Sequence, residues 1–179
     1  MIGWLKNKFL SKYISEKKQR RVRAITSLAK AKTVGLLCHI ESEAAYQNIF
    51  SIFTKLQQHN KNVRLVAFIK EKEVPFYCLQ QLTADYFCLK DLNWYGKPNM
   101  VQVNDFIDIE FDILIDFTTE KNLLPVQLIL QLSQARLITG ANYNHEKLYD
   151  LFIDDKMTNN KALIDNIDLY TRKLIGETV

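Results

Sequence analysis

The sequence alternates short, continuously apolar runs with segments of helical periodicity, and this alternation constrains the fold more than any other feature. The clearest runs are "TVGLLC" at 33–38, "VRLVAFI" at 63–69 and "FDILIDF" at 111–117. Strands that are apolar at successive positions are buried on both faces, as is typical of parallel strands between helices. The pattern predicts an α/β fold, in a three-layer Rossmann-like arrangement with a mainly parallel sheet of five to six strands.

Three weaker apolar segments complete the predicted strand order. They lie at 85–89, 135–140 and 149–153. We expect the strands at 33–38 and 111–117 to be neighbours near the centre of the sheet, because both are apolar on both faces.

Helix-start signals occur between the strands. Ser42 can cap one helix, Pro125 suits the first turn of a second, and Pro75 suits the first turn of a short third that ends near Leu82. A C-terminal helix is predicted to carry one apolar stripe, formed by Leu163, Ile167, Tyr170 and Leu174.

The first 32 residues differ in charge from the rest of the chain. They contain ten Lys or Arg and one acid, Glu16, which gives a balance of +9, whereas residues 33–179 have a balance of −5. The overall charge of +4 therefore belongs to one segment. We predict a basic amphipathic helical arm over 1–32 and a single Rossmann-like domain over 33–179.

The start of this arm has the pattern of an amphipathic helix. Most of its lysines lie around the rest of the helix, while its apolar side is formed by Ile2, Leu5, Phe9 and Tyr13, with Leu10 beside them. Such a helix can lie in the headgroup region of an anionic membrane with Trp4 as an anchor, or it can pack on the domain or on a partner protein. The contact residues under either interpretation are Trp4, Leu5, Lys8, Phe9 and Lys12. Nucleic acid is disfavoured as a partner, because no recognition motif accompanies the basic residues and the body is acidic.

Composition and cysteine usage indicate the compartment. No apolar run approaches the ~20 residues that span a bilayer, and the N-terminus lacks the features of a signal peptide. We therefore expect a cytoplasmic protein, peripheral on the inner membrane if the arm contacts lipid. The cysteines Cys38, Cys78 and Cys88 form no CxxC pair and lie in apolar stretches, so buried free thiols are predicted.

The order of these segments is similar to that of a known family. A basic N-terminal helix, "KTVGLL", "VRLVAFI", "KDLNWYGKP", "FDILIDF" and "LYDLFID" together resemble, over nearly the whole chain, an uncharacterised family of similar-sized Bacteroidetes proteins, a domain of unknown function. Residues 111–140 also resemble the N-terminal Rossmann-like half of heptosyltransferase-type glycosyltransferases, which implies a fold. The chain departs from that family at "CHIESEA", a turn without glycine, and we expect no room for a second, sugar-nucleotide domain.

Ligands of open parallel sheets bind beyond the carboxyl ends of the strands, so the residues there are the first candidates for chemistry. They are His39, Glu41, Glu43, residues 90–98, Asp116, Thr118, Thr119, Glu120, Asn142, Asn144, Asp154 and Asp155. The absence of GxGxxG and GxxxxGK disfavours standard dinucleotide or ATP binding. No nucleophile elbow occurs, and the three histidines lack metal-ligand spacing. We assign no catalytic residue, no metal and no cofactor.

Four edge residues have competing interpretations. Asp116 can converge with Asp154 or Asp155 on a divalent cation, but capping of the next turn is favoured for all three. His39 is favoured as a hydrogen-bonded structural residue.

The loop "DLNWYGKPN" at 91–99 is the best candidate for ligand binding. Its aromatic rings can stack on a sugar or base, or the loop can be a tight turn in which Gly96 and Pro98 set the backbone. The tight turn is favoured. The candidate ligand-binding residues are Asn93, Trp94, Tyr95, Lys97, Asp116 and Thr118.

These observations favour a cytoplasmic binding or interaction domain rather than an enzyme. Its partner would be an unknown protein or an anionic membrane surface, with a small molecule as a further ligand. The alternative is a small enzyme or degenerate transferase that binds a sugar or nucleotide with Trp94, Lys97 and Asp116.

Overall fold

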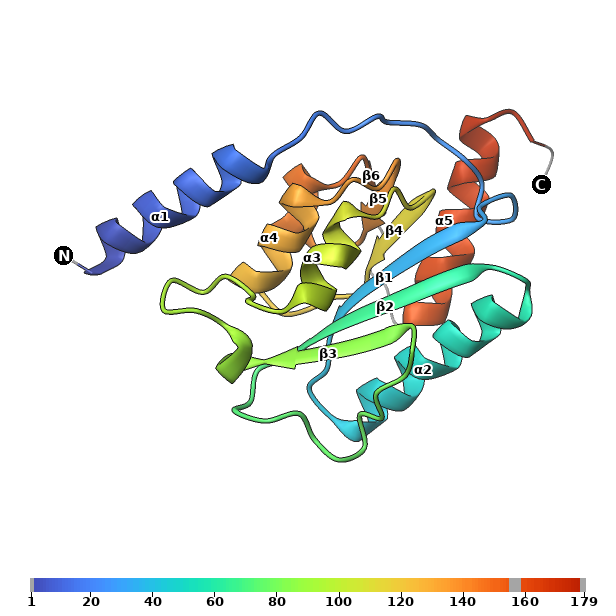
Figure 1. Ribbon diagram of the computed structural model, residues 1–179. Helices are drawn as coiled ribbons and strands as arrows, with labels where there is room; N and C mark the ends of the chain where they lie inside the picture. Colours follow the sequence, from blue (N-terminus) through green and yellow to red (C-terminus); the bar gives the residue numbers. More distant parts are fainter. Residues whose placement is uncertain (1, 155–158, 178–179) are drawn as a thin grey trace.

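Six parallel strands form one sheet in the order β3-β2-β1-β4-β5-β6 (Figure 1). The structure is a computed structural model that describes residues 2–154 and 159–177, with side chains from residue 4 onward. The strands are β1 Thr33–His39, β2 Asn62–Ile69, β3 Ala84–Cys88, β4 Ile113–Asp116, β5 Ile138–Gly140 and β6 Leu151–Phe152. All six predicted strands are present, and β1 and β4 are paired neighbours at the centre, as predicted.

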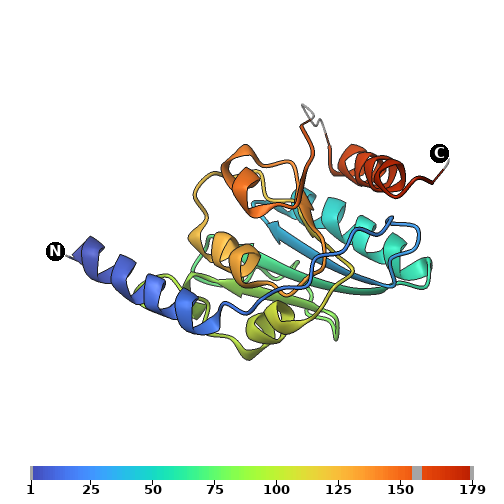
Figure 2. The same cartoon turned by 90° about the horizontal axis from the view of Figure 1, so that it is seen from above.

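Helices cover both faces of the sheet. The described helices are α1 Ile2–Lys17, α2 Glu43–Gln58, α3 Val101–Asp108, α4 Leu124–Leu132 and α5 Asn160–Leu174, with 3₁₀ turns η1 Leu89–Asp91 and η2 Tyr143–Leu148. In Figure 2, α2 and α5 lie on one side of the sheet, while α1, α3 and α4 lie on the other. The predicted three-layer α/β fold is therefore confirmed.

Successive side chains of β1 enter two separate hydrophobic clusters, as the pleat of a strand requires. Leu36 packs in the cluster of α2 and α5, with Phe53 and Ile167, whereas Leu37 packs in the cluster of α3 and α4, with Phe106. All five are fully buried. Each such side chain contributes roughly 1.5–3 kcal/mol on burial, so both helix layers stabilise the sheet.

The predicted helix starts at Ser42 and Pro125 are confirmed, and the C-terminal stripe is confirmed in part. Ser42 caps α2 by accepting a hydrogen bond from the Ala45 amide at 3.2 Å, and Pro125 lies in the first turn of α4. In α5, the first two residues of the stripe are buried, but the last two, Tyr170 and Leu174, are exposed. The buried side of α5 continues through Thr171 instead, so the apolar stripe is only partly the packed side of the helix.

The predicted helix from Pro75 to Leu82 is wrong. Residues 74–80 form turns and irregular structure, with a hydrogen bond from the Cys78 amide to the Pro75 carbonyl. Phe76 and Leu82 are almost fully exposed, so a helix there would gain no buried apolar face. A helix that the sequence analysis did not assign, α3, instead lies between β3 and β4.

The predicted arm has two structural parts. After α1, residues 18–27 run beside the ends of β5 and β6, where Arg21 and Arg23 form ion pairs with Asp150. Leu28 and Ala31 then join the cluster of α2 and α5. The domain boundary at residue 32 remains a prediction, but the residues just before it already pack in the core.

The predicted free thiols are confirmed. Cys38, Cys78 and Cys88 are buried and form no disulfide. Burial raises the pKa of Cys38 well above its ordinary value and raises that of Cys78 to about 11. These thiols therefore stay protonated at neutral pH.

Asp112 joins the residues before β1 to the start of β4, and its contribution to stability should depend on pH. Burial alone would raise its pKa, but hydrogen bonds from the Thr33 and Lys32 amides, at 3.0 and 2.8 Å, lower the pKa below its ordinary value. Because the pKa of Asp112 is lower in the folded chain than in the unfolded chain, its carboxylate stabilises the fold. This contribution is complete above the pKa of about 3.9 that an Asp has in the unfolded chain, and it is lost as the pH falls through the lower pKa of the folded chain. We expect Asp112→Asn to cost about 1.5–3 kcal/mol at pH 7.

That difference should shrink on acidification below pH ~4, because the wild-type carboxylate then becomes protonated. Urea unfolding of both proteins over a pH series measures it. A difference that stays constant with pH would contradict this assignment.

Candidate functional site

The loop 91–99 lies against α1, so two sets of predicted contact residues meet. The Phe9 ring lies 5.2 Å from Trp94 in an edge contact and 5.9 Å from Tyr95 in a stacked contact, measured between centroids. The Lys97 ammonium lies 4.4 Å from the centre of the Tyr13 ring. We call Phe9, Trp94 and Tyr95 the aromatic surface.

The tight-turn interpretation of this loop is confirmed. The side-chain oxygen of Asn93 accepts hydrogen bonds from the amides of Tyr95 and Lys97, at 3.2 and 2.9 Å. Gly96 has φ +92°, a left-handed conformation that favours glycine, and its amide donates to the Asn93 carbonyl. Trp94 nevertheless remains 55% exposed, so its ring does not serve as a buried cover. Ligand binding by Asn93, Trp94, Tyr95 and Lys97 stays a prediction.

Helix α1 packs on the body mainly through its second half. Leu10 is its only buried residue among those whose side chains are described, while Tyr13 and Ile14 are half-buried against the cluster of α3 and α4. Its first half exposes the apolar side chains Trp4, Leu5 and Phe9, and Figure 1 shows this half extending beyond the body. The Ile2 side chain lies outside the described residues. Packing on the domain therefore accounts for only part of the predicted apolar side.

Basic side chains continue along the chain from α1. Lys6, Lys8 and Lys12 are exposed on α1, with Lys8 over the Trp4 ring at 5.2 Å and Lys12 paired with Glu16. A groove of ≈ 480 Å³ then lies between residues 18–23 and α4; its basic lining residues are Lys18, Arg20, Arg21, Arg23 and Lys147. The N-terminal segment thus presents positive charge both on α1 and beside the body.

The carboxyl edge of the sheet carries a buried hydrogen-bond network centred on Asp116. One carboxylate oxygen accepts from the Thr118 amide at 2.9 Å, and the other accepts from His145 Nδ1 at 2.8 Å and from the Tyr149 hydroxyl at 2.6 Å. Burial and the charge of Asp116 raise the pKa of Tyr149 far above its ordinary value. A Cβ at Gly140 would lie 2.7 Å from the Tyr149 ring, so this glycine allows the close approach. The capping interpretation of Asp116 is confirmed by the Thr118 contact.

A second polar group lies at the same edge. His39, at the end of β1, places Nδ1 3.3 Å from a Glu41 carboxylate oxygen and 3.2 Å from Oε2 of Glu120. The other Glu120 oxygen pairs with Lys70, and this contact lowers the pKa of Glu120. The Asn142 side chain also donates to the Glu120 backbone carbonyl at 3.1 Å. His39, Glu41 and Glu120 were all predicted at this edge from the sequence, and the acid two residues after the strand-end histidine is a signal for their grouping.

Among the described residues, Asp116 does not share a hydrogen-bond partner with the other residues that were predicted to bind a cation or a ligand. Asp154 accepts a hydrogen bond from the Tyr143 hydroxyl, whereas Asp116 is bonded to Thr118, His145 and Tyr149. Asp155 lies outside the described residues. Trp94 and Lys97 contact α1, so they and Asp116 have different partners.

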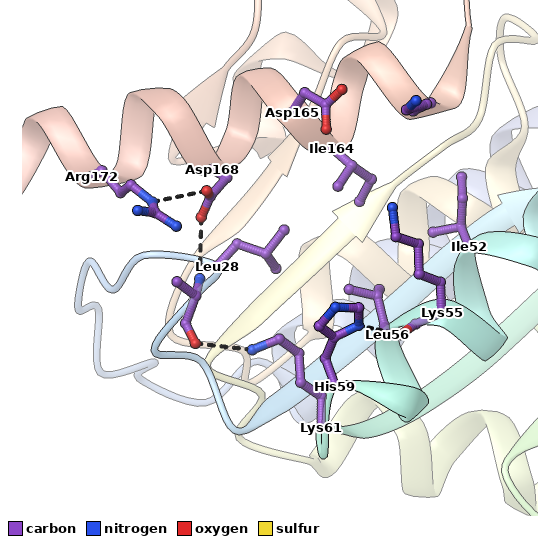
Figure 3. Close-up of a pocket in the computed structure, with 12 residues that line it drawn as sticks. Leu28, Ile52, Lys55, Leu56, His59, Lys61, Ile164, Asp165, Asp168 and Arg172 are labelled. Atoms are coloured by element: carbon purple, nitrogen blue, oxygen red, sulfur yellow. Dashed lines mark hydrogen bonds and ion pairs between the residues drawn. The ribbon is translucent and has the colours of Figure 1, made fainter. Parts of the chain in front are cut away.

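A groove of ≈ 330 Å³ lies between α2, α5 and the residues before β1 (Figure 3). Three of its charged groups, Lys61, Asp168 and Arg172, have structural partners. Asp168 accepts from the Ala29 amide at 3.1 Å and pairs with Arg172, while the Lys61 ammonium donates to the Ala29 and Ala31 carbonyls. These contacts fasten the segment before β1 to the two helices, so we assign the groove a structural role.

The strand order and the exposed helix define the class of protein. It is an all-parallel α/β domain of Rossmann strand order, with an N-terminal helix whose exposed apolar and basic side chains adjoin the loop 91–99. The model of a family of unknown function (DUF6913) matches residues 6–174, and the chain belongs to this family. No curated protein matches the chain. The predicted membership of a family of unknown function is confirmed.

The Asp116 network should contribute measurably to stability. Tyr149→Phe removes a hydroxyl that donates to a buried carboxylate, so we expect a loss of about 1.5–3 kcal/mol in urea unfolding. Tyr143→Phe is the matched control, because its hydroxyl donates to the exposed Asp154, and it should cost less than about 1 kcal/mol. Equal losses in the two variants would contradict the burial of the network.

The aromatic surface should contribute little to stability. Because Trp94 is more than half exposed, Trp94→Ala should cost about 1 kcal/mol, well below the roughly 3 kcal/mol or more of a buried ring. A double-mutant cycle with Phe9→Ala should give a coupling of about 0.5–1.5 kcal/mol, as for aromatic pairs in edge contact. A coupling near zero would show that the Phe9 contact is not maintained in solution.

Proposed function

We propose that the protein is a cytoplasmic binding protein that docks on an anionic membrane surface through α1 and the aromatic surface. The observation that carries this proposal is the exposed first half of α1, where Trp4 is 66% and Phe9 45% exposed. Exposed aromatic side chains beside lysines are the composition of helices that lie in the headgroup region. The role is one of binding, without a reaction.

Charge supports an anionic partner rather than an apolar one. Ten basic residues and one acid lie before residue 33, whereas the body is net acidic. Each basic residue near an anionic leaflet contributes about 1 kcal/mol of attraction. The acidic body would be repelled from the same leaflet, so the charge distribution favours an orientation with α1 toward the lipid.

The apolar side chains supply the second part of the interaction. Leu5 and Phe9 lie one helical turn apart and therefore on the same side of α1, and Phe9 contacts Trp94. Among acyl chains the Phe9 ring would be buried as a hydrocarbon, while a tryptophan ring buries its apolar body and keeps its indole N–H hydrated. No helix among the described residues is long and apolar enough to cross a membrane.

A second candidate function is the binding of a sugar or nucleotide at the carboxyl ends of the strands, as a small enzyme or degenerate transferase. It is favoured by the reversal of strand order between β1 and β4, where doubly wound sheets bind ligands. The local resemblance of residues 111–140 to heptosyltransferase-type enzymes is consistent with it. A sugar or nucleotide that raised the melting temperature specifically would favour this function over membrane docking.

Membrane docking predicts salt-dependent binding to anionic vesicles. Full-length protein should co-sediment with phosphatidylglycerol-containing vesicles, bind pure phosphatidylcholine vesicles weakly, and dissociate as salt shortens the Debye length below ~10 Å. Lys8→Glu with Lys12→Glu should lower the partition coefficient about thirtyfold or more, because two lysines contribute about 2 kcal/mol. Deletion of residues 1–17 should abolish binding.

The matched control reverses two lysines on the opposite face of the sheet. Lys55→Glu with Lys161→Glu makes the same change in net charge on α2 and α5, and it should leave most of the binding intact. Thermal melting of each variant checks that the body stays folded. Failure of the full-length protein to bind anionic vesicles at low salt would reject membrane docking.

A further inference from the structure

The group formed by His39, Glu41 and Glu120 lies where the strand order of the sheet reverses. His39 ends β1, Glu41 follows it just before the capped start of α2, and Glu120 lies in the loop between β4 and α4. β1 and β4 are the two strands on either side of the reversal, and the crevice beyond their carboxyl ends is the place where doubly wound sheets bind ligands. The three side chains come from both sides of this crevice.

The spacing of their ligand atoms fits a metal ion. Nδ1 of His39 lies 3.3 and 3.2 Å from the two carboxylate oxygens, and the three atoms all lie within 4.8 Å of one another. In a tetrahedral site with bonds of about 2.0–2.2 Å, ligand atoms are separated by about 3.3–3.6 Å. The two histidine–carboxylate distances therefore require only a small adjustment around an ion.

The buried state of His39 is an independent indication of a ligand. Its side chain is 4% exposed, yet neither ring nitrogen makes a hydrogen bond within the described part of the chain. Buried imidazole nitrogens are normally hydrogen-bonded or bound to metal. Nδ1 is directed at two carboxylates without the alignment of a hydrogen bond, so it lacks the partner that its burial requires.

Neighbouring groups hold the carboxylates in place. Lys70 pairs with Oε1 of Glu120 and leaves Oε2 toward His39, and the Asn142 side chain binds the Glu120 backbone. Such outer contacts orient metal ligands in known sites. The Glu41 side chain is 55% exposed, so the group is open to solvent.

We propose that His39, Glu41 and Glu120 bind a divalent transition-metal ion of the zinc type at the carboxyl edge of the sheet. A nitrogen ligand distinguishes this site from those of Mg²⁺ and Ca²⁺, which use oxygen ligands. Two carboxylates balance the charge of the ion, while the positive charge of the nearby Lys70 weakens its binding. Three protein ligands leave a fourth position open to water or to a small ligand, as in catalytic zinc sites.

Isothermal titration of the full chain with Zn²⁺, with Co²⁺ absorption as a second readout, tests the site. We expect one ion per chain, and at least tenfold weaker binding in each of His39→Gln, Glu41→Gln and Glu120→Gln. Glu43→Gln is the matched control, because it removes an exposed carboxylate two residues from Glu41, and it should bind as the wild type does. The buried thiols, whose pKa values are raised, should not compete.

If His39→Gln or Glu120→Gln folds poorly, Glu41→Gln still tests the proposal. The Glu41 side chain is exposed, so its substitution should not affect folding. Zn²⁺ should also raise the melting temperature of the wild type and of Glu43→Gln, but not that of Glu41→Gln. No stoichiometric binding by the wild type would overturn the proposal and leave His39 as a structural residue beside two carboxylates. Equal binding by wild type and Glu41→Gln would overturn it as well.

Discussion

The requirement that an all-parallel sheet be covered on both faces determines the arrangement of this protein. Strands β1 and β4 are apolar on both sides, so the chain must place α2 and α5 on one face and α3 and α4 on the other. To reach the second face after β3, the chain crosses through the loop 91–99 before α3 begins. The loop and α1 consequently lie on the same face, which is why Phe9 meets Trp94 and Tyr95.

The same crossing creates the reversal of strand order between β1 and β4. Two polar groups lie at this point of the sheet, one around Asp116 and one around His39, and they differ in their hydrogen bonding. Around Asp116, both carboxylate oxygens accept hydrogen bonds from buried donors, so this network fixes the edge of the sheet. At His39, a buried ring faces two carboxylates without forming a hydrogen bond. The Asp116 carboxylate has hydrogen-bond donors on both oxygens, so stability explains it, although the buried Nε2 of His145 beside it has no partner among the described residues. At His39 the unpaired ring also faces two carboxylate oxygens at 3.2 and 3.3 Å, and this geometry carries the ligand proposal.

Sequence reasoning recovered the parts of the fold that depend on local pattern. The continuous apolar runs of β1 and β4 predicted their central position, and Ser42 and Pro125 marked helix starts that the structure has. It failed at 75–82, where Phe76, Leu79 and Leu82 have helical spacing but are exposed rather than packed on the body. It also could not bring Glu120 to His39, because their proximity depends on the pairing of β1 with β4 rather than on spacing along the chain.

The two proposed surfaces share one edge of the sheet. The loop 91–99 follows the carboxyl end of β3 and contacts Phe9, so the exposed half of α1 lies toward the same edge as the group at His39. A membrane that bound α1 would therefore face the carboxyl ends of the strands. The surface contacts come from α1 and the loop after β3, whereas the group at His39 comes from β1, α2 and the loop after β4. Because different elements supply them, loss of one need not disturb the other.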